Sequence, residues 1–188
     1  MTSVSSSPNA TPRSILIIRL SAIGDIIMAS GVIPCLRAAF PTATLAWLME
    51  AGNEDLLRHN PRLDRIYSWP RRRWRALRKQ GDYRTWWREF WQLQRDLRHQ
   101  QFDWILDLQG LMKSGAWAWL TRGRRRIGLG SKEGSQWLMT ETVARDLDSP
   151  LIAKEYRRLM VELDAAPERF AMDIVISPAS ARQGRKLL

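Results

Sequence analysis

The chain has 188 residues, 45% of them hydrophobic, which is enough for one domain with an apolar core. Its single cysteine, Cys35, excludes an internal disulfide and a zinc site built from cysteine pairs, and its place in an apolar pattern favours a buried thiol. The two histidines, His59 and His99, lack metal-ligand spacing, so no metal site is expected. No apolar run reaches the roughly 18 residues of a membrane-spanning helix. Residues 1–13 are polar and lack a secretory core, so we expect a disordered lead and a cytoplasmic protein.

The formal charge of +11 is concentrated in the middle of the chain. Residues 58–126 contain 18 Lys and Arg against 6 Asp and Glu, so this segment carries the whole excess. Localised positive charge indicates a polyanionic partner. Nucleic acid, anionic lipid and a phosphorylated sugar all fit that description.

The first structural signal is an apolar run at 15–20 that ends in the sequence S-A-I-G-D and leads into a helix expected at 25–39. The run predicts a buried strand, with Asp25 near its carboxyl end, where open parallel sheets bind ligands. Two interpretations stay open. Ser21, Gly24 and Asp25 could simply start the helix, as cap, tight turn and dipole partner. Alternatively Asp25 is a general base, which requires a direct hydrogen bond to the reacting hydroxyl. The turn is not G-x-G-x-x-G, so the dinucleotide fingerprint is absent.

Strands and helices are predicted to alternate along the rest of the chain. Further strands are expected at 44–49, 65–69, 104–108 and 126–129, with a less regular candidate at 173–176. Further helices are expected at 53–58, 85–99, 112–121 and 152–163, with another at 179–188. This alternation predicts an α/β fold, a Rossmann-like parallel sheet with helices on both faces.

Several of the ten tryptophans fall in the helix expected at 85–99. An apolar stripe at helical spacing is formed there by Trp86, Phe90, Leu93 and Leu97, and it is widened by Trp87 and Trp91. Core packing against the sheet is favoured for these aromatics. The alternative is that part of this face meets a membrane surface, since mixed Trp and Arg suit an interface.

A basic segment, Arg71-Arg72-Arg73-Trp74-Arg75, places four arginines within five positions. Such crowding is unfavourable unless an anion is nearby, and Arg is suited to bidentate phosphate contact. The alternative is a solvated loop. A second basic run, 124–126, is either the start of a strand or a further phosphate contact.

The segment D-L-Q-G-L-M-K-S at 107–114 predicts a strand that ends in a turn at Gln109 and Gly110. Lys113 and Ser114 then lie in the first turn of a helix, beside backbone N–H groups that could form an anion or sugar pocket. The alternative is a turn glycine followed by a solvated lysine.

Three segments together resemble the N-terminal half of glycosyltransferase family 9, the lipopolysaccharide heptosyltransferases. They are S-I-L-I-I-R-L-S-A-I-G-D-I-I-M-A-S at 14–30, F-D-W-I-L-D-L-Q-G-L-M-K-S at 102–114, and R-R-I-G at 125–128. The combination of S-x-x-G-D and D-x-Q-G-x-x-K-S, in that order, is specific. Within the family, W-P-R-R-R-W-R at 69–75 is most similar to heptosyltransferase I.

The resemblance implies a GT-B architecture of two Rossmann-like domains that face each other across a cleft. Residues 14–171 would then be the acceptor-binding domain. Residues 172–188 would be a linker or the start of a truncated nucleotide-sugar-binding domain, which makes a separate C-terminal half an expected partner.

The resemblance also implies an activity, the inverting transfer of heptose from ADP-heptose to Kdo-lipid A, without a metal or cofactor. It implies a peripheral place on the cytoplasmic side of the inner membrane of a Gram-negative bacterium, and no nucleic-acid partner. The implied catalytic base is Asp25. The implied acceptor-binding residues are Ser21, Gly24, Arg71, Arg72, Arg73, Arg75, Gln109, Gly110, Lys113 and Ser114.

Two alternatives remain open. One is a non-catalytic acceptor-binding half. The other is a basic nucleic-acid-binding module, which would need exposed aromatics on the same face as the arginines.

Overall fold

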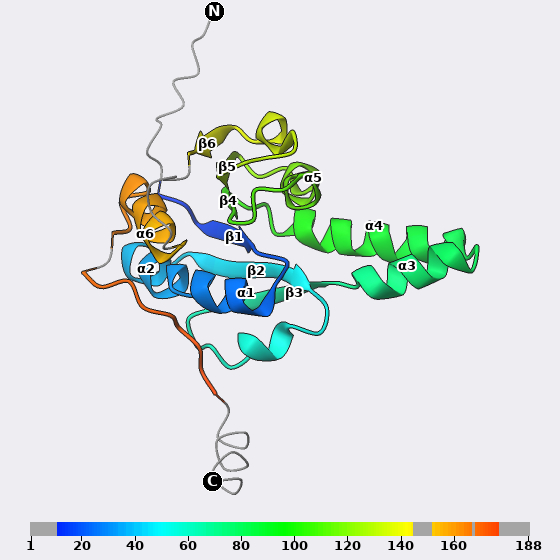
Figure 1. Ribbon diagram of the computed structural model, residues 1–188, viewed down its shortest axis with the longest axis horizontal. Helices are drawn as coiled ribbons and strands as arrows, with labels where there is room; N and C mark the ends of the chain where they lie inside the picture. The colour runs from blue at the N-terminus through cyan, green and yellow to red at the C-terminus, as the bar shows by residue number, and fades with distance from the viewer. Residues whose placement is uncertain (1–10, 145–151, 167, 177–188) are drawn as a thin grey trace, which may run out of the picture.

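A computed structural model describes residues 11–144, 152–166 and 168–176 of the chain (Figure 1). Within them lies a parallel sheet of six strands in the order β3-β2-β1-β4-β5-β6. The strands are β1 (Ser14–Ile18), β2 (Thr44–Glu50), β3 (Arg65–Trp69), β4 (Trp104–Asp107), β5 (Arg125–Leu129) and β6 (Glu141–Val143). This is the strand order of Rossmann folds, so the predicted α/β class is confirmed.

Helices cover both faces of the sheet, as expected. They are α1 (Ile23–Ala29), α2 (Val32–Ala39), α3 (Arg71–Lys79), α4 (Tyr83–His99), α5 (Met112–Thr121) and α6 (Ile152–Glu162), with short 3₁₀ turns η1 (Glu54–Leu56) and η2 (Ser135–Leu138). One face packs on α1, α2 and α6, and the other on α3, α4 and α5 (Figure 1).

The central strand β1 shows why its sequence is apolar at every position. Ile15 and Ile17 belong to the core beneath α1, α2 and α6, while Leu16 and Ile18 belong to the core on the opposite face. Successive side chains of a strand point to opposite faces, so a strand covered on both sides needs a continuous apolar run.

Strands β1 and β4 form the switch point of the sheet. The chain leaves β1 toward β2 on one side, and later returns through β4 to build β5 on the other side. The connections from β1 and β4 therefore run to opposite sides of the sheet, and doubly wound sheets bind ligands at the carboxyl ends of the two strands at such a point.

Several predicted boundaries were wrong. The helix expected at 25–39 is divided at Ser30 and Gly31 into α1 and α2. A Cβ at Gly31 would lie 2.6 Å from the Phe170 ring, so a glycine there leaves room for Phe170. The helix expected at 53–58 is only the 3₁₀ turn η1. Residues 71–75, treated as a loop, begin the helix α3, while the strand β6 was not predicted at all.

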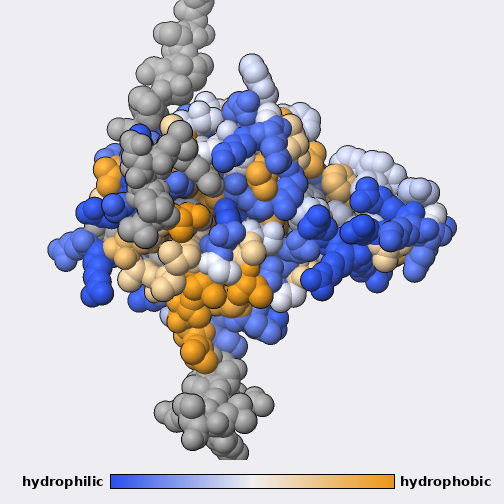
Figure 2. Space-filling view, in the orientation of Figure 1, coloured by the Kyte–Doolittle hydropathy of each residue, from blue (hydrophilic) through white to orange (hydrophobic). Residues whose placement is uncertain are grey.

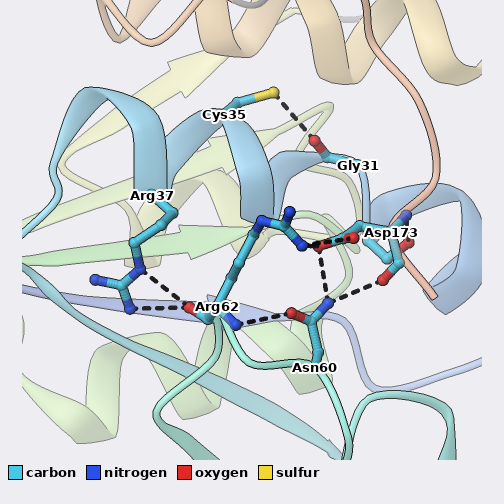
Figure 3. A network of polar contacts seen from close by, with 7 residues as sticks. Gly31, Cys35, Arg37, Asn60, Arg62 and Asp173 are labelled. Carbon is cyan, nitrogen blue, oxygen red and sulfur yellow. Dashed lines mark hydrogen bonds and ion pairs between the residues drawn. The ribbon is translucent and has the colours of Figure 1, made fainter. Parts of the chain in front are cut away.

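The expected strand at 173–176 is also wrong, because Asp173 is held against helices and loops instead of a sheet edge (Figure 3). Its N–H donates to Ser30 Oγ at 2.8 Å, and its Oδ2 accepts from Asn60 Nδ2 at 2.8 Å. Arg62 Nη1 lies 3.2 Å from its Oδ1. We call residues 170–176 the C-terminal strap.

At the other end, the expected disordered lead of residues 1–13 extends too far, because residues 11–13 are part of the domain. Pro12 is buried, and the Arg13 N–H donates to Asp103 Oδ2 at 2.8 Å. Residues 1–10, and the helix expected at 179–188, lie outside the described residues.

The expectation of a buried thiol at Cys35 is confirmed. Its Sγ–H donates to the Gly31 carbonyl (Figure 3), and burial raises its pKa to about 11. A thiol with such a pKa is protonated at neutral pH and is not a nucleophile.

The α3–α4 hairpin reaches out from the sheet (Figure 1). At its base Trp74 packs with Trp86, Phe90 and Trp117, so part of the predicted aromatic core is real. Trp87 and Trp91, which were expected to pack in the core, are about half exposed instead, because they lie on the side of α4 that faces away from α3 and the sheet. None of the helices in the described ranges is both long and apolar enough to span a bilayer.

A candidate active site at the switch point of the sheet

The loops after β1 and β4 are joined by a buried arginine, Arg19. Its Nη1 donates to the Leu108 carbonyl at 2.7 Å, and its Nη2 lies 2.5 Å from Asp25 Oδ2. Charge-assisted hydrogen bonds of this length are the strong ones, and Arg supplies several donors in a fixed plane. Arg19 therefore sets the position of Asp25 relative to the end of β4.

Asp25 is held by one oxygen and leaves the other available. Besides Arg19, its Oδ2 accepts from the Ala22 N–H at 3.2 Å, which fixes the carboxylate against its own turn. Among the described residues Oδ1 has no hydrogen-bond partner, and the side chain is 42% exposed. A carboxylate with one anchored and one open oxygen can accept a proton from a bound hydroxyl.

Ser21 and Gly24 do not have the places that the capping interpretation requires. Ala22, not Ser21, is the N-cap residue of α1, and the side-chain hydrogen bond at this helix start comes from Asp25, which accepts from the Ala22 N–H. Gly24 lies inside the first turn of α1 with nothing within 4 Å of where a Cβ would stand. A glycine in a helix is unfavourable, so this open space suits the close approach of a ligand to the backbone.

The turn after β4 is built by groups that were expected to bind a ligand. The Gln109 side-chain oxygen accepts from the Leu20 N–H at 2.9 Å and so ties β4 to β1. Gly110 has φ +67°, and a Cβ there would lie 2.6 Å from the Leu129 carbonyl oxygen. Both residues therefore have structural reasons for their identity.

Asp107 organises the same turn from the interior. It is fully buried and accepts hydrogen bonds from the N–H groups of Gln109 and Gly110 and from the Ser114 hydroxyl, at 3.0, 3.1 and 3.0 Å. Burial raises the pKa of Asp107, although these hydrogen bonds and nearby Arg19 oppose the rise. Ser114 is fully buried too. Lys113 forms no ion pair with any described residue.

The four arginines of α3 do not act alike. Arg71 lies 3.5 Å from Glu50 at the end of β2 and over the Trp69 ring, and the Glu50 N–H donates to the Leu20 carbonyl at the end of β1. These contacts place Arg71 at the carboxyl ends of the strands, and Asp25 lies at the same end of the sheet.

Arg73 instead makes a bidentate ion pair with Glu89 on α4, at 2.7–3.1 Å. Arg72 and Arg75 are exposed and form no ion pair with any other described residue. The helix separates the four because successive residues point about 100° apart.

Sequence reasoning missed Arg19 and Glu50. The available signal for Arg19 was a charged residue directly after a buried apolar strand. The run at 124–126 fits the structural alternative, since Arg125 forms a bidentate pair with Glu141 at 2.8 Å across β5 and β6. Within the described residues, no group of three or more His, Cys, Asp or Glu side chains could hold a metal ion.

Comparison with known proteins finds the same resemblance. The family model described as glycosyltransferase family 9 (heptosyltransferase) matches residues 90–186. The Haemophilus influenzae lipopolysaccharide core heptosyltransferase OpsX is 27% identical over 141 residues, which are 74% of this chain and 37% of that protein. The Pseudomonas aeruginosa lipopolysaccharide heptosyltransferase 1 is 32% identical over 147 residues, 77% of this chain and 36% of that protein.

Solved structures show the same fold. The Veillonella parvula glycosyl transferase family 9 structure has a TM-score of 0.73 and 17% identity, with 93% of this chain and 48% of that chain covered. Escherichia coli heptosyltransferase WaaC with ADP-2-deoxy-2-fluoro heptose has a TM-score of 0.72 and 19% identity, with 85% and 51% covered.

This chain therefore spans a little over a third of these curated relatives and about half of the solved structures. The family model covers slightly more than half of the chain, and hydrogen bonds join the predicted S-x-x-G-D and D-x-Q-G-x-x-K-S turns at the switch point. The chain belongs to glycosyltransferase family 9, the heptosyltransferases.

Proposed function

We propose that this chain forms the acceptor side of an inverting heptosyltransferase of lipopolysaccharide core biosynthesis. The donor is ADP-heptose and the acceptor is a hydroxyl of Kdo-lipid A. The observation that carries the proposal is the Asp25 carboxylate at the switch point of the sheet, anchored through one oxygen by buried Arg19 and open at the other. The names of the relatives support the choice of sugar, and one neighbouring structure contains an ADP-heptose analogue.

In the proposed reaction Asp25 is the general base. The acceptor oxygen attacks the anomeric carbon of heptose and forms the new carbon–oxygen bond. The bond from that carbon to the ADP phosphate oxygen breaks, and ADP leaves with the electron pair. The acceptor proton passes to Asp25 Oδ1, while Arg19 keeps Oδ2 in place. General-base assistance of this kind contributes about 10²–10⁴-fold in rate.

The cations that would hold the anionic acceptor are Arg71, Arg72, Arg75 and Lys113. Arg71 lies at the carboxyl ends of the strands, as Asp25 does. The other three side chains form no ion pair with any described residue. Arg73 contributes less, because Glu89 already occupies its guanidinium. Bidentate contact between Arg and phosphate would position the acceptor and add affinity.

We assign donor binding to the part of the relatives' length that this chain does not span. This division makes a non-catalytic acceptor-binding half the second candidate. The chain alone should then bind Kdo-lipid A and not ADP-heptose, and calorimetric titration with each substrate measures that.

The test of catalysis is Asp25→Asn in the complete enzyme, with heptose transfer and Kdo-lipid A binding measured side by side. We expect turnover to fall about 10²–10⁴-fold with acceptor affinity retained. Asp55→Asn is the matched control, since Asp55 is an exposed carboxylate on η1 and should leave turnover unchanged. Full turnover in Asp25→Asn with normal acceptor binding rejects the assignment.

A further inference from the structure

The α3–α4 hairpin exposes an aromatic ladder on the outer side of α4. Tyr83, Trp87 and Trp91 follow one another at intervals of four residues and are 56%, 47% and 49% exposed. Residues four apart lie on the same face of a helix, one turn above the other. We call Tyr83, Trp87 and Trp91 the aromatic ladder.

The two tryptophans of the ladder pack on other rings of the hairpin. Trp87 stacks on Trp91 with centroids 6.0 Å apart and planes 19° apart, and its centroid lies 4.5 Å from that of Trp86 and 5.7 Å from that of Phe90, both in T-shaped arrangements. Phe90 packs in turn on Trp74 in the core of the hairpin. Trp87 and Trp91 are therefore supported from beneath while about half of each stays exposed.

Positive charge surrounds the ladder. Residues 71–99 contain ten Lys and Arg against three Asp and Glu. Arg84 and Arg88 each follow a ladder residue, and neither forms an ion pair with any residue that the structure describes. The hairpin reaches out from the sheet in Figure 1, and in Figure 2 the same end of the molecule is predominantly hydrophilic. Nothing else in the described chain covers this face.

We propose that the aromatic ladder and Arg84 and Arg88 form a docking surface for a bilayer that contains anionic phospholipid. Trp and Tyr favour the membrane–water interface because each ring has an apolar body and a polar edge. Arginines beside them meet the phosphates of the headgroups. This inference goes beyond the sugar transfer, and it does not depend on the chemistry at Asp25.

The ring geometry favours a membrane over nucleic acid. The nucleic-acid alternative requires exposed aromatics beside arginines, and the hairpin does have them. Stacking with a base, however, requires a free ring face. Trp87 already stacks on Trp91, and the centroids of two further rings lie 4.5–5.7 Å from its own. A base would therefore meet a ring that is already stacked, whereas placement among lipid headgroups requires no free ring face.

The test is co-sedimentation of the full chain with vesicles of phosphatidylcholine alone and of an equal mixture of phosphatidylcholine and phosphatidylglycerol. We expect binding to the anionic vesicles that weakens as salt is raised, because salt screens the arginine contribution. The double variant Trp87→Gln, Trp91→Gln should lose at least about tenfold in partition to them. The double variant Arg84→Gln, Arg88→Gln should lose about thirtyfold on anionic vesicles and little on neutral ones.

Trp137→Gln is the matched control, because Trp137 is the most exposed tryptophan (84%) and lies on η2, away from the hairpin. It should bind vesicles like the unchanged chain, and Asp25→Asn should too, which separates this inference from the proposed catalysis. Circular dichroism melting confirms that each variant is folded. Unchanged vesicle binding by the two double variants overturns the proposal. Binding of single-stranded DNA that both double variants lose, without vesicle binding by the parent, overturns it in favour of nucleic acid.

Discussion

At the scale of single residues, Arg19 and Asp25 depend on each other. A buried guanidinium is costly unless its donors are occupied, and Asp25 and the Leu108 carbonyl occupy the two Nη atoms of Arg19. Arg19 Nε is buried without a partner among the described residues. Asp25→Asn is therefore a better probe than Asp25→Ala, since its amide oxygen can still accept from Arg19.

Replacing two glycines of the site by alanine should change the stability of the fold in opposite directions. Gly24→Ala should raise the free energy of unfolding by about 0.5–1 kcal/mol, because a helical glycine loses chain entropy and the added Cβ meets nothing within 4 Å. The same change should weaken transfer in the complete enzyme, if a substrate uses that space. Thermal denaturation and a transfer assay measure the two effects.

Gly110→Ala provides the contrast. Its φ of +67° and a Cβ position 2.6 Å from the Leu129 oxygen should cost at least about 2 kcal/mol of stability. Equal melting temperatures for the two variants would contradict this interpretation of both glycines.

At the scale of elements, Glu89 joins the two helices of the hairpin. It accepts from Arg73 and from the indole N–H of buried Trp74 at 3.0 Å. The hydrogen bond from Arg73 in particular holds the pKa of Glu89 below its ordinary value, although burial opposes this. A lowered folded-state pKa stabilises the fold above the ordinary carboxyl pKa, near 4.3. This stabilisation is lost as the pH falls through the lower, folded-state value.

Two substitutions separate the charge of Glu89 from its hydrogen bond. Glu89→Gln should be less stable than the parent at neutral pH, and the difference should disappear as the pH is lowered into the acid range. Glu89→Ala should lower the free energy of unfolding by about a further 1–3 kcal/mol, because the Trp74 N–H is then buried without an acceptor. Urea denaturation between pH 3 and 7 measures both, over the range in which a carboxyl titrates. A pH-independent difference for Glu89→Gln would show that the ion pair adds nothing.

At the scale of the whole molecule, the C-terminal strap fastens onto parts of the chain that are far away in sequence. Asp173 contacts Asn60 and Arg62 (Figure 3) as well as Ser30. Phe170 occupies the space in which a Cβ of Gly31 would stand. Beyond these contacts the strap exposes Met172 and Ile176. In Figure 2 hydrophobic side chains gather where this segment passes below the helices. The strap therefore fixes how the chain leaves the sheet domain.

Asp173→Ala should loosen the strap while leaving the core intact, because two backbone hydrogen bonds of residue 173 remain. We expect trypsin to cleave after Arg169 several-fold faster, with little change in melting temperature. Mass spectrometry of timed digests measures the cleavage. Asp96→Ala is the control, since Asp96 is exposed on α4, far in sequence from the cleavage site, and forms no ion pair with a described residue. Equal cleavage rates in the two variants would show that Asp173 does not hold the strap.

Five of the six strands, most helices and the two turns of the candidate site could be predicted from sequence. The signals are local: an uninterrupted apolar run for β1, and apolar residues at helical spacing for α4. Which side chains pair with each other depends on the tertiary contacts, because one charge pattern is compatible with many pairings. The tertiary structure joins Arg19 to Leu108, 89 residues away, and Asp173 to Asn60, 113 residues away. It also pairs Arg73 with Glu89, so Arg73 differs from its unpaired neighbours Arg72 and Arg75. Trp87 and Trp91 lie at the surface. Burial and pairing depend on which elements pack together, and that is settled by the whole fold.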